Sequence, residues 1–533
     1  MTDSTTIEEV LAQDFRTLPK LIRLHAAQRP GHIALRQDAR SLDYRGLDEL
    51  ADRIAASLQR ERVKPKQAIA ICAGTSIEYA AVFLGALRAG VAVAPLAPSS
   101  TPASIASMVN DAGAPLLFVD ACVAKALGPV RDRIAAEWIS LDDAAAGTSF
   151  QNWLVAAGAV PAAVVAEPDA PFNLIYSSGT TGTPKGIEQS NRMRWRQWQR
   201  AFDYDYKPDS VTIVSTPLYS NTTLVSFLPT LAVGGVVVLM AKFDATQFLQ
   251  LAQKYRATTA MLVPVQYSRI MALAEFGRYD LTRFRAKFCT SAPFAAALKA
   301  DILKRWPGRL IEYYGMTEGG GTCVLEATLH PDKLHTVGCP APGHDIRLID
   351  EQGRELPRGA TGEVVGHSEG IMTGYHNQPA KTAQAEWHDA TGKRFIRTGD
   401  IGRFDEDGFL ILMDRKKDMI ISGGFNVYPS DLEAVLRGHA DVAEAAVVGV
   451  PSERWGETPV AFVVAKRRDP QLSNTLLEWT NSRLGKTQRL AAVELVESLP
   501  RNAIGKGLKR ELRDRYQARV ARQIYGGAVV RTK

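Results

Sequence analysis

The chain has 533 residues, more than one hydrophobic core usually supports, so two or more domains are expected. Hydrophobic residues make up 46% and charged residues 23%, proportions that are ordinary for a globular protein and unlike those of a disordered chain. The net charge of +7 arises within residues 414–533, where 21 Lys and Arg face 14 Asp and Glu. No nucleic-acid-binding motif accompanies this excess, so a nucleic-acid partner is not expected.

The sequence contains no pattern typical of a signal peptide, a membrane span, a zinc site or a disulfide framework. The start of the chain, MTDSTTIEEV, is polar and acidic, the opposite of a signal peptide, and no apolar run reaches the roughly 18 residues that span a bilayer. A cytoplasmic protein without a membrane span is therefore expected.

The five cysteines are widely spaced and contain no Cys-x-x-Cys pair, so neither a zinc site nor a disulfide framework is predicted: Cys72, Cys122, Cys289, Cys323 and Cys339.

Short apolar runs alternate with segments of helical periodicity in the first half of the chain. Strands are expected at 67–72, 92–96, 115–120, 212–215, 236–240 and 260–263, and helices at 47–60, 76–89, 101–112 and 245–255. Such alternation predicts an α/β fold with largely parallel sheets. Between 335 and 413 the helical periodicity disappears, and strands near 362–366 and 409–413 indicate a β-rich subdomain.

The charged run DRKKD at 414–418 marks the expected domain boundary. It separates a large N-terminal domain, residues 1–413, from a small α+β domain, residues 414–533. Ser430 and Glu433 match a capping box, which predicts a helix that ends at Gly438. Strands are expected after it, near 442–450 and 459–465.

The most informative segment is YSSGTTGTPKG at 176–186, which follows an apolar run and combines five Ser and Thr hydroxyls, three glycines and a lysine. Glycines admit an anion close to backbone N–H groups, and the lysine adds a positive charge, so the pattern predicts a phosphate-binding loop. A polar surface loop is the alternative. A P-loop is excluded because Lys185 is followed by Gly186, not by Ser or Thr. The predicted phosphate-binding residues are Ser177, Ser178, Gly179, Thr180, Thr181, Gly182 and Lys185.

Further motifs follow in order: YYGMTE at 313–318 with three glycines after it, FIRTGD at 395–400, the charged run at 414–418 and PRNAIGK at 500–506. Each is weak alone, since a Thr-Glu pair in a glycine-rich turn is usually structural. Together with the phosphate-binding loop they resemble the acyl-adenylate-forming family of acyl-CoA and aryl-CoA ligases, including the 4-coumarate–CoA ligase type, peptide-synthetase adenylation domains and beetle luciferases. The resemblance covers nearly the whole chain.

The resemblance implies ATP, Mg²⁺ and coenzyme A as the small molecules that the enzyme uses. Thr317 would contact the α-phosphate and the substrate carboxylate, Glu318 would bind Mg²⁺, and Lys506 would bridge the carboxylate and the α-phosphate. No general base is required, because the carboxylate is already ionised at pH 7. The nucleoside would be bound by Tyr314 on the adenine, with Gly315 and Met316 beside it, and by Asp400 on the ribose, with Arg415 nearby.

A second half-reaction is also implied, in which the C-terminal domain rotates and a thiol displaces AMP. Lys417 would be the hinge, and Gly423 and Gly424 would line the thiol tunnel. Trp455 would stack on the adenine of coenzyme A, with a packed core aromatic as the alternative. The expected enzyme is therefore an AMP-forming acid–thiol ligase that releases pyrophosphate and AMP. Both a monomer and a homodimer are compatible with the sequence.

The residues expected at the acyl pocket bear on which carboxylic acid is the substrate. Tyr219 and Ser220 are expected at the acyl pocket, where many CoA ligases of the family have a histidine in place of Ser220, and the absence of an acidic residue there argues against an α-amino acid. Together with Phe227 and Met316, these residues favour an aromatic or arylalkenoic acid over a medium-chain fatty acid. Loading of a carrier protein or release of the acyl-AMP is the alternative product. It is disfavoured because no carrier domain follows and the tunnel glycines are present, and a non-catalytic nucleotide-binding protein is disfavoured because Lys506 is present.

The glycine triplet after Glu318 has two explanations. Gly319, Gly320 and Gly321 are expected to leave room for a wide acyl group; the competing explanation is that they serve a backbone conformation with positive φ. The first explanation makes them substrate-pocket residues. The second makes them part of the turn that carries Thr317 and Glu318.

Overall fold

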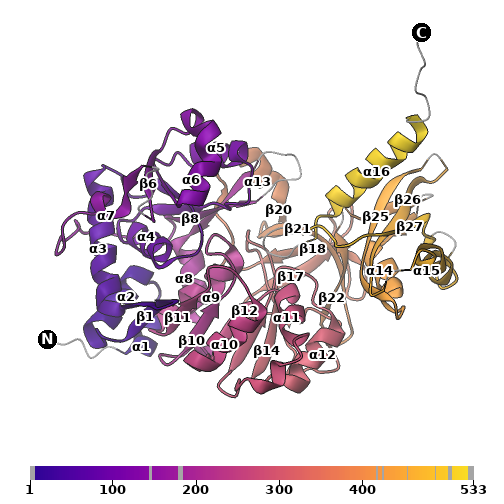
Figure 1. Ribbon diagram of the computed structural model, residues 1–533, viewed down its shortest axis with the longest axis horizontal. Coiled ribbons are helices and arrows are strands. Elements are labelled where there is room, and N and C mark those ends of the chain that lie inside the picture. Colours follow the sequence, from indigo (N-terminus) through magenta and orange to yellow (C-terminus); the bar gives the residue numbers. More distant parts are fainter. Residues whose placement is uncertain are drawn as a thin grey trace, which may run out of the picture. The chain divides into compact units, whose positions relative to one another are not determined.

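The structure is a computed structural model that describes residues 6–142, 147–177, 184–415, 418–422, 425–452, 454–467, 469–485, 488–501 and 507–525 (Figure 1). The side chains of residues 414–415, 425–426 and 521–525 also lie outside this description. The chain forms two compact units. The first unit is Met1–Ile346 with Val365–Arg397, and the second is Arg347–Val364 with Thr398–Lys533.

These units divide the chain differently from the domain boundary expected after residue 413. Strand β21 (Arg394–Phe404) crosses the division, and β22 (Leu410–Arg415) pairs with it antiparallel, from Asp400 opposite Arg415 to Phe404 opposite Leu410. The second unit therefore includes residues 398–413 together with the C-terminal segment.

One sheet of the first unit contains the expected phosphate-binding segment. Its strand order is β19-β9-β8-β4-β3-β5-β6-β7, in which the strands from β8 to β7 are parallel, β9 is antiparallel to β8 and β19 is antiparallel to β9. The strands at 67–72, 92–96 and 115–120 that the sequence predicts are confirmed as β3, β4 and β5. The bounds are β3 (Ala68–Cys72), β4 (Ala92–Pro95), β5 (Leu116–Val119), β6 (Glu137–Ser140), β7 (Thr148–Ser149), β8 (Pro171–Ser177), β9 (Lys185–Ser190) and β19 (Gly374–Tyr375).

The second sheet of this unit has the order β16-β15-β14-β13-β12-β10-β11-β1-β2. The strands from β14 to β1 are mutually parallel, so the carboxyl ends of β10, β12, β13 and β14 lie along one edge, where ligands of α/β sheets usually bind. The bounds are β1 (Ile33–Gln37), β2 (Arg40–Asp43), β10 (Val211–Val214), β11 (Val236–Leu239), β12 (Thr259–Leu262), β13 (Ala286–Cys289), β14 (Arg309–Tyr314), β15 (Cys323–Glu326) and β16 (Cys339–Pro340).

The helices of the first unit pack their apolar faces on these sheets. Ile22, Ile54, Phe83 and Leu231 come from four different helices, are at most 1% exposed and belong to one core cluster. The four expected helices are confirmed as α3, α4, α5 and α10. The bounds are α1 (Ile7–Leu11), α2 (Leu18–Gln28), α3 (Tyr44–Arg60), α4 (Ile77–Arg88), α5 (Pro102–Asp111), α6 (Ala121–Leu127), α7 (Phe150–Trp153), α8 (Asn191–Gln199), α9 (Asn221–Ala232), α10 (Ala245–Tyr255), α11 (Pro264–Met271), α12 (Ala296–Arg305) and α13 (Pro379–Ala385).

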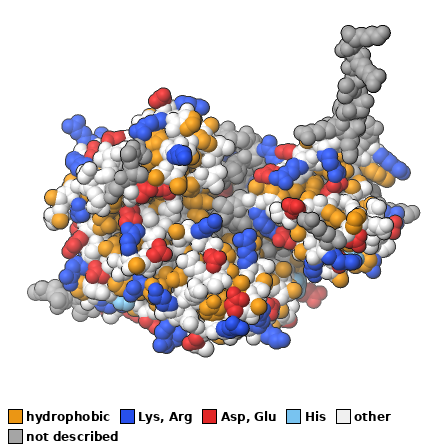
Figure 2. Space-filling model, viewed as in Figure 1, with side chains coloured by type: hydrophobic (Ala, Val, Ile, Leu, Met, Phe, Trp, Pro, Cys, Tyr) orange, Lys and Arg blue, Asp and Glu red, His pale blue; other side chains and the backbone are white. Residues whose placement is uncertain are grey.

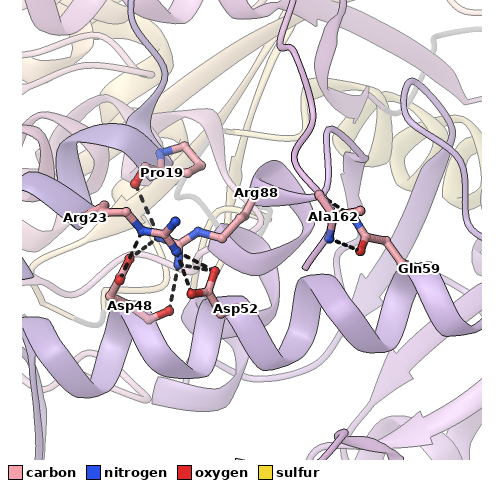
Figure 3. Close-up of polar contacts among 7 residues, drawn as sticks. All are labelled: Pro19, Arg23, Asp48, Asp52, Gln59, Arg88 and Ala162. Carbon is pink, nitrogen blue, oxygen red and sulfur yellow. Dashed lines mark hydrogen bonds and ion pairs between the residues drawn. The ribbon is translucent and has the colours of Figure 1, made fainter. Parts of the chain in front are cut away.

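A cluster of ion pairs joins α2, α3 and α4 (Figure 3). The side chain of Arg88 of α4 is 7% exposed; it donates to the carboxylates of Asp48 and Asp52 and, at 2.7 Å, to the Asp48 carbonyl. Arg23 of α2 donates to Asp52 at 2.6 Å. Asp48 and Asp52 of α3 thus accept from Arg88 of α4 and from Arg23 of α2, which links the three helices through charged hydrogen bonds.

A third sheet has the order β17-β18-β21-β20, with β22 on β21. It comprises the β-rich subdomain that the sequence predicts, and α13 is a short helix within the region where no helix was expected. The bounds of its remaining strands are β17 (Asp345–Ile349), β18 (Gly362–His367) and β20 (Glu386–His388).

The C-terminal segment forms the small α+β fold that the sequence predicts, with strand order β24-β23-β26-β25 and β27 parallel to β26. The two expected strands are confirmed as β25 and β26. The bounds are β23 (Ile420–Ser422), β24 (Phe425–Val427), α14 (Pro429–Arg437), β25 (Val442–Ser452), β26 (Gly456–Ala465), α15 (Leu472–Asn481), β27 (Ala492–Leu495) and α16 (Lys509–Tyr525).

The predicted capping box at the start of α14 is wrong. The N-cap residue is Tyr428, because Pro429 occupies the first helical position, and Ser430 therefore lies inside the first turn. Glu433 instead accepts from the backbone N–H of Val447 at 2.9 Å. The helix ends at Gly438 as expected.

The surface and the thiols agree with the composition. On the face shown in Figure 2, basic and acidic side chains are interspersed. All five cysteines are free thiols. None of the helices in the described part of the chain combines the length and the apolarity that crossing a bilayer requires.

Candidate active site

The two described ends of the expected phosphate-binding segment lie on neighbouring strands. Strands β8 and β9 pair antiparallel, with Ser177 opposite Lys185 and Tyr176 opposite Gly186. Lys185 therefore begins a strand, which rules out the helix that follows the lysine of a P-loop. Five of the predicted phosphate-binding residues lie outside the described residues: Ser178, Gly179, Thr180, Thr181 and Gly182.

Lys185 and Glu318 are connected through Tyr375, a residue that the sequence did not single out. Tyr375 comes to this position because β19 pairs with β9, placing Tyr375 opposite Ile187. The Lys185 ammonium lies 4.7 Å from the centroid of the Tyr375 ring, and the Tyr375 hydroxyl donates to Glu318 Oε1 at 2.9 Å. Burial raises the pKa of the Tyr375 hydroxyl, so the phenol stays protonated and remains a donor.

The Glu318 carboxylate fits the Mg²⁺ site that the resemblance implies. It is half-buried, and the bond from Tyr375 fixes its orientation while leaving the capacity of a two-oxygen group to accept a cation. Among the described residues no cluster of three or more His, Cys, Asp or Glu side chains could hold a metal. Mg²⁺ bound with substrate phosphates needs only one or two protein carboxylates, so the residues present fit this cation.

Removing the Tyr375 hydroxyl should weaken the magnesium site. For Tyr375→Phe we expect the Mg²⁺ concentration at half-maximal activity to rise about 10- to 100-fold, as is typical when the partner of a metal ligand is lost. A Mg²⁺ titration of pyrophosphate release measures this. The matched control is Tyr267→Phe, which removes a bond from a buried hydroxyl to the Phe288 carbonyl and leaves the bond from Tyr375 to Glu318 in place. An equal shift in both variants would contradict the role of Tyr375.

An ion pair flanks β9 beside Gly186. His376 Nδ1 lies 3.2 Å from Glu188 Oε2, and the backbone N–H of His376 donates to the Gly186 carbonyl at 2.7 Å. The bond to Glu188 raises the pKa of His376 above its ordinary value of 6.5. The contact thus supports the strand that carries Lys185 most strongly when the imidazole is protonated.

This pair predicts a pH-dependent stability. Because the folded-state pKa is raised, the stabilisation is complete below the unfolded pKa of 6.5 and is lost as the pH rises through the raised value. Partly exposed pairs contribute about 0.2–1 kcal/mol. Urea unfolding should show wild type more stable than His376→Gln at pH 6, with the difference shrinking as the pH rises through the raised pKa of His376. A difference that grows with pH would contradict this assignment.

The two tyrosines that end β14 have different environments. The Tyr313 ring stacks on Phe288 at a centroid distance of 5.7 Å and packs edge-on against Tyr204. Side chains alternate between the faces of a strand, so Tyr314 lies on the opposite face from this packed cluster. The arrangement is consistent with Tyr314 as the adenine-stacking residue, with Gly315 exposed and Met316 half-buried after it.

Thr317 is held by a residue from another sheet. Gln189 of β9 is fully buried, and its Nε2 donates to the Thr317 carbonyl at 2.6 Å. The backbone of Glu318 is held in turn, because the N–H of Met372 donates to its carbonyl at 2.8 Å. The Thr317–Glu318 segment is therefore fixed on both sides.

The proposed acyl-pocket residues follow β10, at the carboxyl edge of the second sheet. Tyr219 is half-buried, and burial raises the pKa of its hydroxyl, while Ser220 is buried at the N-cap of α9. The loop after β13 reaches the same place, since the hydroxyls of Thr222 and Ser291 lie 2.5 Å apart. Phe227, in contrast, is 1% exposed within the core, so it does not line an open pocket.

Ser291 adds a feature that the sequence analysis missed. Its φ of 81° lies in the left-handed region, where a non-glycine residue is strained. Such strain is concentrated at functional sites, and here it occurs at the same sheet edge as Tyr314 and Ser220. A serine gives no sequence signal for this conformation, whereas a glycine would have.

The glycine triplet adopts positive φ throughout, with values of 74° at Gly319, 84° at Gly320 and 153° at Gly321. A Cβ added to Gly320 would lie 2.8 Å from both the Gly366 carbonyl oxygen and the Ile396 Cβ. At Gly319 and Gly321 an added Cβ would likewise meet other atoms at 1.9 and 2.3 Å. This geometry supports the backbone explanation of the triplet over an open pocket wall.

In the second unit, Asp400 is half-buried on β21, opposite Arg415 of β22 in the strand register. The Asp400 N–H donates to the Thr398 hydroxyl at 3.0 Å. Trp455 is 45% exposed, which excludes the packed-core alternative, and its ring lies 4.8 Å from the Arg454 guanidinium carbon. Four expected functional residues lie outside the described residues: Lys417, Gly423, Gly424 and Lys506.

Comparison with known proteins identifies the family of this chain. Residues 22–376 match the family model described as AMP-binding enzyme, and residues 431–506 match the AMP-binding enzyme C-terminal domain. Similar relatives include the fatty acid–[acyl-carrier-protein] ligase ScoC of Streptomyces coeruleorubidus, 33% identical over 96% of this chain and 98% of the relative, and a feruloyl-CoA synthase of Amycolatopsis sp, 31% identical over 92% and 97%. The crystal structure of ATP-bound MatB from Rhodopseudomonas palustris matches with a TM-score of 0.83 and 28% identity, over 94% of this chain and 99% of that one. The chain therefore belongs to the AMP-binding enzyme family, the acyl-adenylate-forming ligases that its motifs resemble.

Proposed function

We propose that this enzyme is an ATP-dependent carboxylic acid–CoA ligase that acts on an aromatic or arylalkenoic acid. The observation that carries the proposal is the contact chain from Lys185 through Tyr375 to Glu318. It joins the cation of the expected phosphate-binding segment to a carboxylate suited to Mg²⁺, next to the Thr317 segment. These are the groups that a reaction between a carboxylate and a triphosphate requires.

In the first half-reaction, a carboxylate oxygen of the acid attacks the α-phosphorus of ATP, and the bond to the pyrophosphate oxygen breaks. The two reactants repel each other, so the site must supply positive charge where negative charge accumulates. Lys185 and Lys506 would supply it, and a Mg²⁺ held by Glu318 would neutralise further charge on the phosphates. The acid arrives ionised, so no side chain needs to remove a proton.

In the second half-reaction, the sulfur of a thiol attacks the acyl carbon and the bond to AMP breaks. Lys417 would act as the hinge between the two steps, and Gly423 and Gly424 would admit the thiol arm. Trp455 supports coenzyme A as the acceptor, because an exposed indole can stack on its adenine. The relative ScoC, named as a carrier-protein ligase, supports an acyl carrier protein as the second candidate.

For the acid, an arylalkenoic substrate is supported by Tyr219, a half-buried aromatic at the carboxyl edge of the second sheet, and by similarity to feruloyl-CoA synthase. Ser220 leaves this position small and without charge. The name of ScoC makes a fatty acid the competing substrate class.

The experiment is pyrophosphate release with ferulate, cinnamate, octanoate and acetate, followed by AMP release with either coenzyme A or a phosphopantetheinylated carrier protein. We expect the highest kcat/KM for an arylalkenoic acid and AMP release that depends on coenzyme A. A higher kcat/KM for octanoate would show that the substrate is a fatty acid instead of an arylalkenoic acid. AMP release that requires the carrier protein and does not occur with coenzyme A would show that the acceptor is a carrier protein.

A further inference from the structure

Helix α8 contributes a buried cation whose partners are all neutral. Arg194 is 1% exposed, and its guanidinium donates to four amide oxygens: Asn173 Oδ1 at 3.1 Å, Gln189 Oε1 at 2.5 Å, Gln197 Oε1 at 2.9 Å and Asn221 Oδ1 at 2.8 Å. No carboxylate in the described part of the chain forms an ion pair with it. Burial lowers the pKa of Arg194 to about 9, so the group still carries its charge at neutral pH.

A buried charge without a counter-ion is costly, so its amide environment requires an explanation. Arg194 is 1% exposed and already bonded to four oxygens, so its guanidinium is not available to bind a substrate anion. An aspartate or glutamate would be the simpler partner for a guanidinium. A side-chain amide differs in one respect: it accepts with its oxygen and still donates with its nitrogen.

The guanidinium therefore determines which way the Gln189 amide faces. Arginine only donates, so an amide that contacts it must present oxygen. Gln189 Oε1 is turned toward Arg194 and also accepts from Asn173 Nδ2 at 2.9 Å. The Nε2 group consequently points to the other side, where it donates to the Thr317 carbonyl at 2.6 Å. In a chain of this kind each bond polarises and strengthens the next.

We propose that Arg194 and Gln189 are positioning residues for the adenylation step: Arg194 fixes the Gln189 amide, and Gln189 holds the Thr317–Glu318 segment against the nucleotide. This inference rests on the proposed function, in which Thr317 contacts the α-phosphate and the carboxylate. It explains why residue 189 is an amide, since a carboxylate there could not donate to the Thr317 carbonyl.

The informative variant is Gln189→Glu. A glutamate keeps an oxygen toward Arg194 and supplies the missing counter-charge, so the variant should unfold at a temperature no lower than Gln189→Leu. It nevertheless loses the donor to Thr317 and places a carboxylate beside a carbonyl oxygen. We expect kcat for pyrophosphate release to fall about 10- to 100-fold in both variants, equivalent to about 1.4–2.7 kcal/mol. KM for ATP and for the acid should change far less.

The matched control is Gln197→Leu, which also removes one amide oxygen from Arg194 but leaves Gln189 bonded to Thr317. Its kcat should stay near that of wild type. If Gln189→Glu keeps the wild-type kcat, or if kcat in all three variants follows their melting temperatures, the positioning role is wrong. If wild type releases no pyrophosphate with any acid tested, the proposed function fails and the inference fails with it.

Discussion

Replacing Lys506 by alanine is expected to lower the rate of acyl-adenylate formation by about 10²–10³-fold, the usual effect of removing one group that stabilises charge in a transition state. The family resemblance places this lysine between the substrate carboxylate and the α-phosphate. Its ammonium would offset the repulsion between the two anions as the anhydride bond forms. Pyrophosphate release at saturating ATP and acid measures the effect.

Two controls make this result specific to the first half-reaction. Thioester formation from supplied acyl-AMP and coenzyme A should survive in Lys506→Ala, because AMP is already attached to the acyl group. Lys509→Ala removes a neighbouring lysine that pairs with Glu433 at 2.8 Å, and its adenylation rate should remain close to that of wild type. Equal loss of both half-reactions in a folded Lys506→Ala protein would remove Lys506 from its proposed role.

Substituting leucine for Gly320 should reduce activity toward every acid alike and destabilise the fold. The φ of 84° disfavours a side chain, and the added Cβ would lie 2.8 Å from the Gly366 carbonyl oxygen. Strain of this kind costs about 1–3 kcal/mol, and overpacking adds about 1–3 kcal/mol more. The turn that carries Thr317 and Glu318 would shift, so kcat/KM should fall for acetate and for ferulate by the same factor.

Gly392→Leu is the matched control for backbone strain alone. Gly392 has a φ of 83° in the same unit, and an added Cβ there meets no atom within 4 Å. This variant should show a smaller loss of stability, measured by urea unfolding, and unchanged activity. A Gly320→Leu enzyme that keeps full activity on acetate but not on ferulate would support the pocket-wall explanation.

Local signals in the sequence predicted much of this molecule. Helix α10 has the expected bounds because Asp244 caps it, its side chain accepting from the Gln247 N–H, and because Phe248, Leu249 and Ala252 are buried on one face. Strand β3 (Ala68–Cys72) likewise lies within the apolar run at 67–72, where the sequence predicts a strand. In both cases the information is contained within about ten neighbouring residues.

The rest depends on contacts that a local pattern cannot encode. Gln189 bonds to a residue 128 positions away, and Tyr375 reaches Glu318 across 57 positions. Periodicity shows which face of a strand is buried but not which element covers it. The capping box at Ser430 failed for a local reason, since a proline beside it set the helix start.

The order of strands in the second sheet also bears on how the protein is made. Strand β1 pairs with β11, joining Leu35 to Val237, so about 200 residues must be synthesised before the first strand meets its parallel neighbour. At about 5–20 residues per second, this interval is roughly 10–40 s on the ribosome. During that time β2 covers one edge of β1 and the other edge stays unpaired. An unpaired strand edge can pair with another chain, so folding of this unit during synthesis is expected to depend on chaperones.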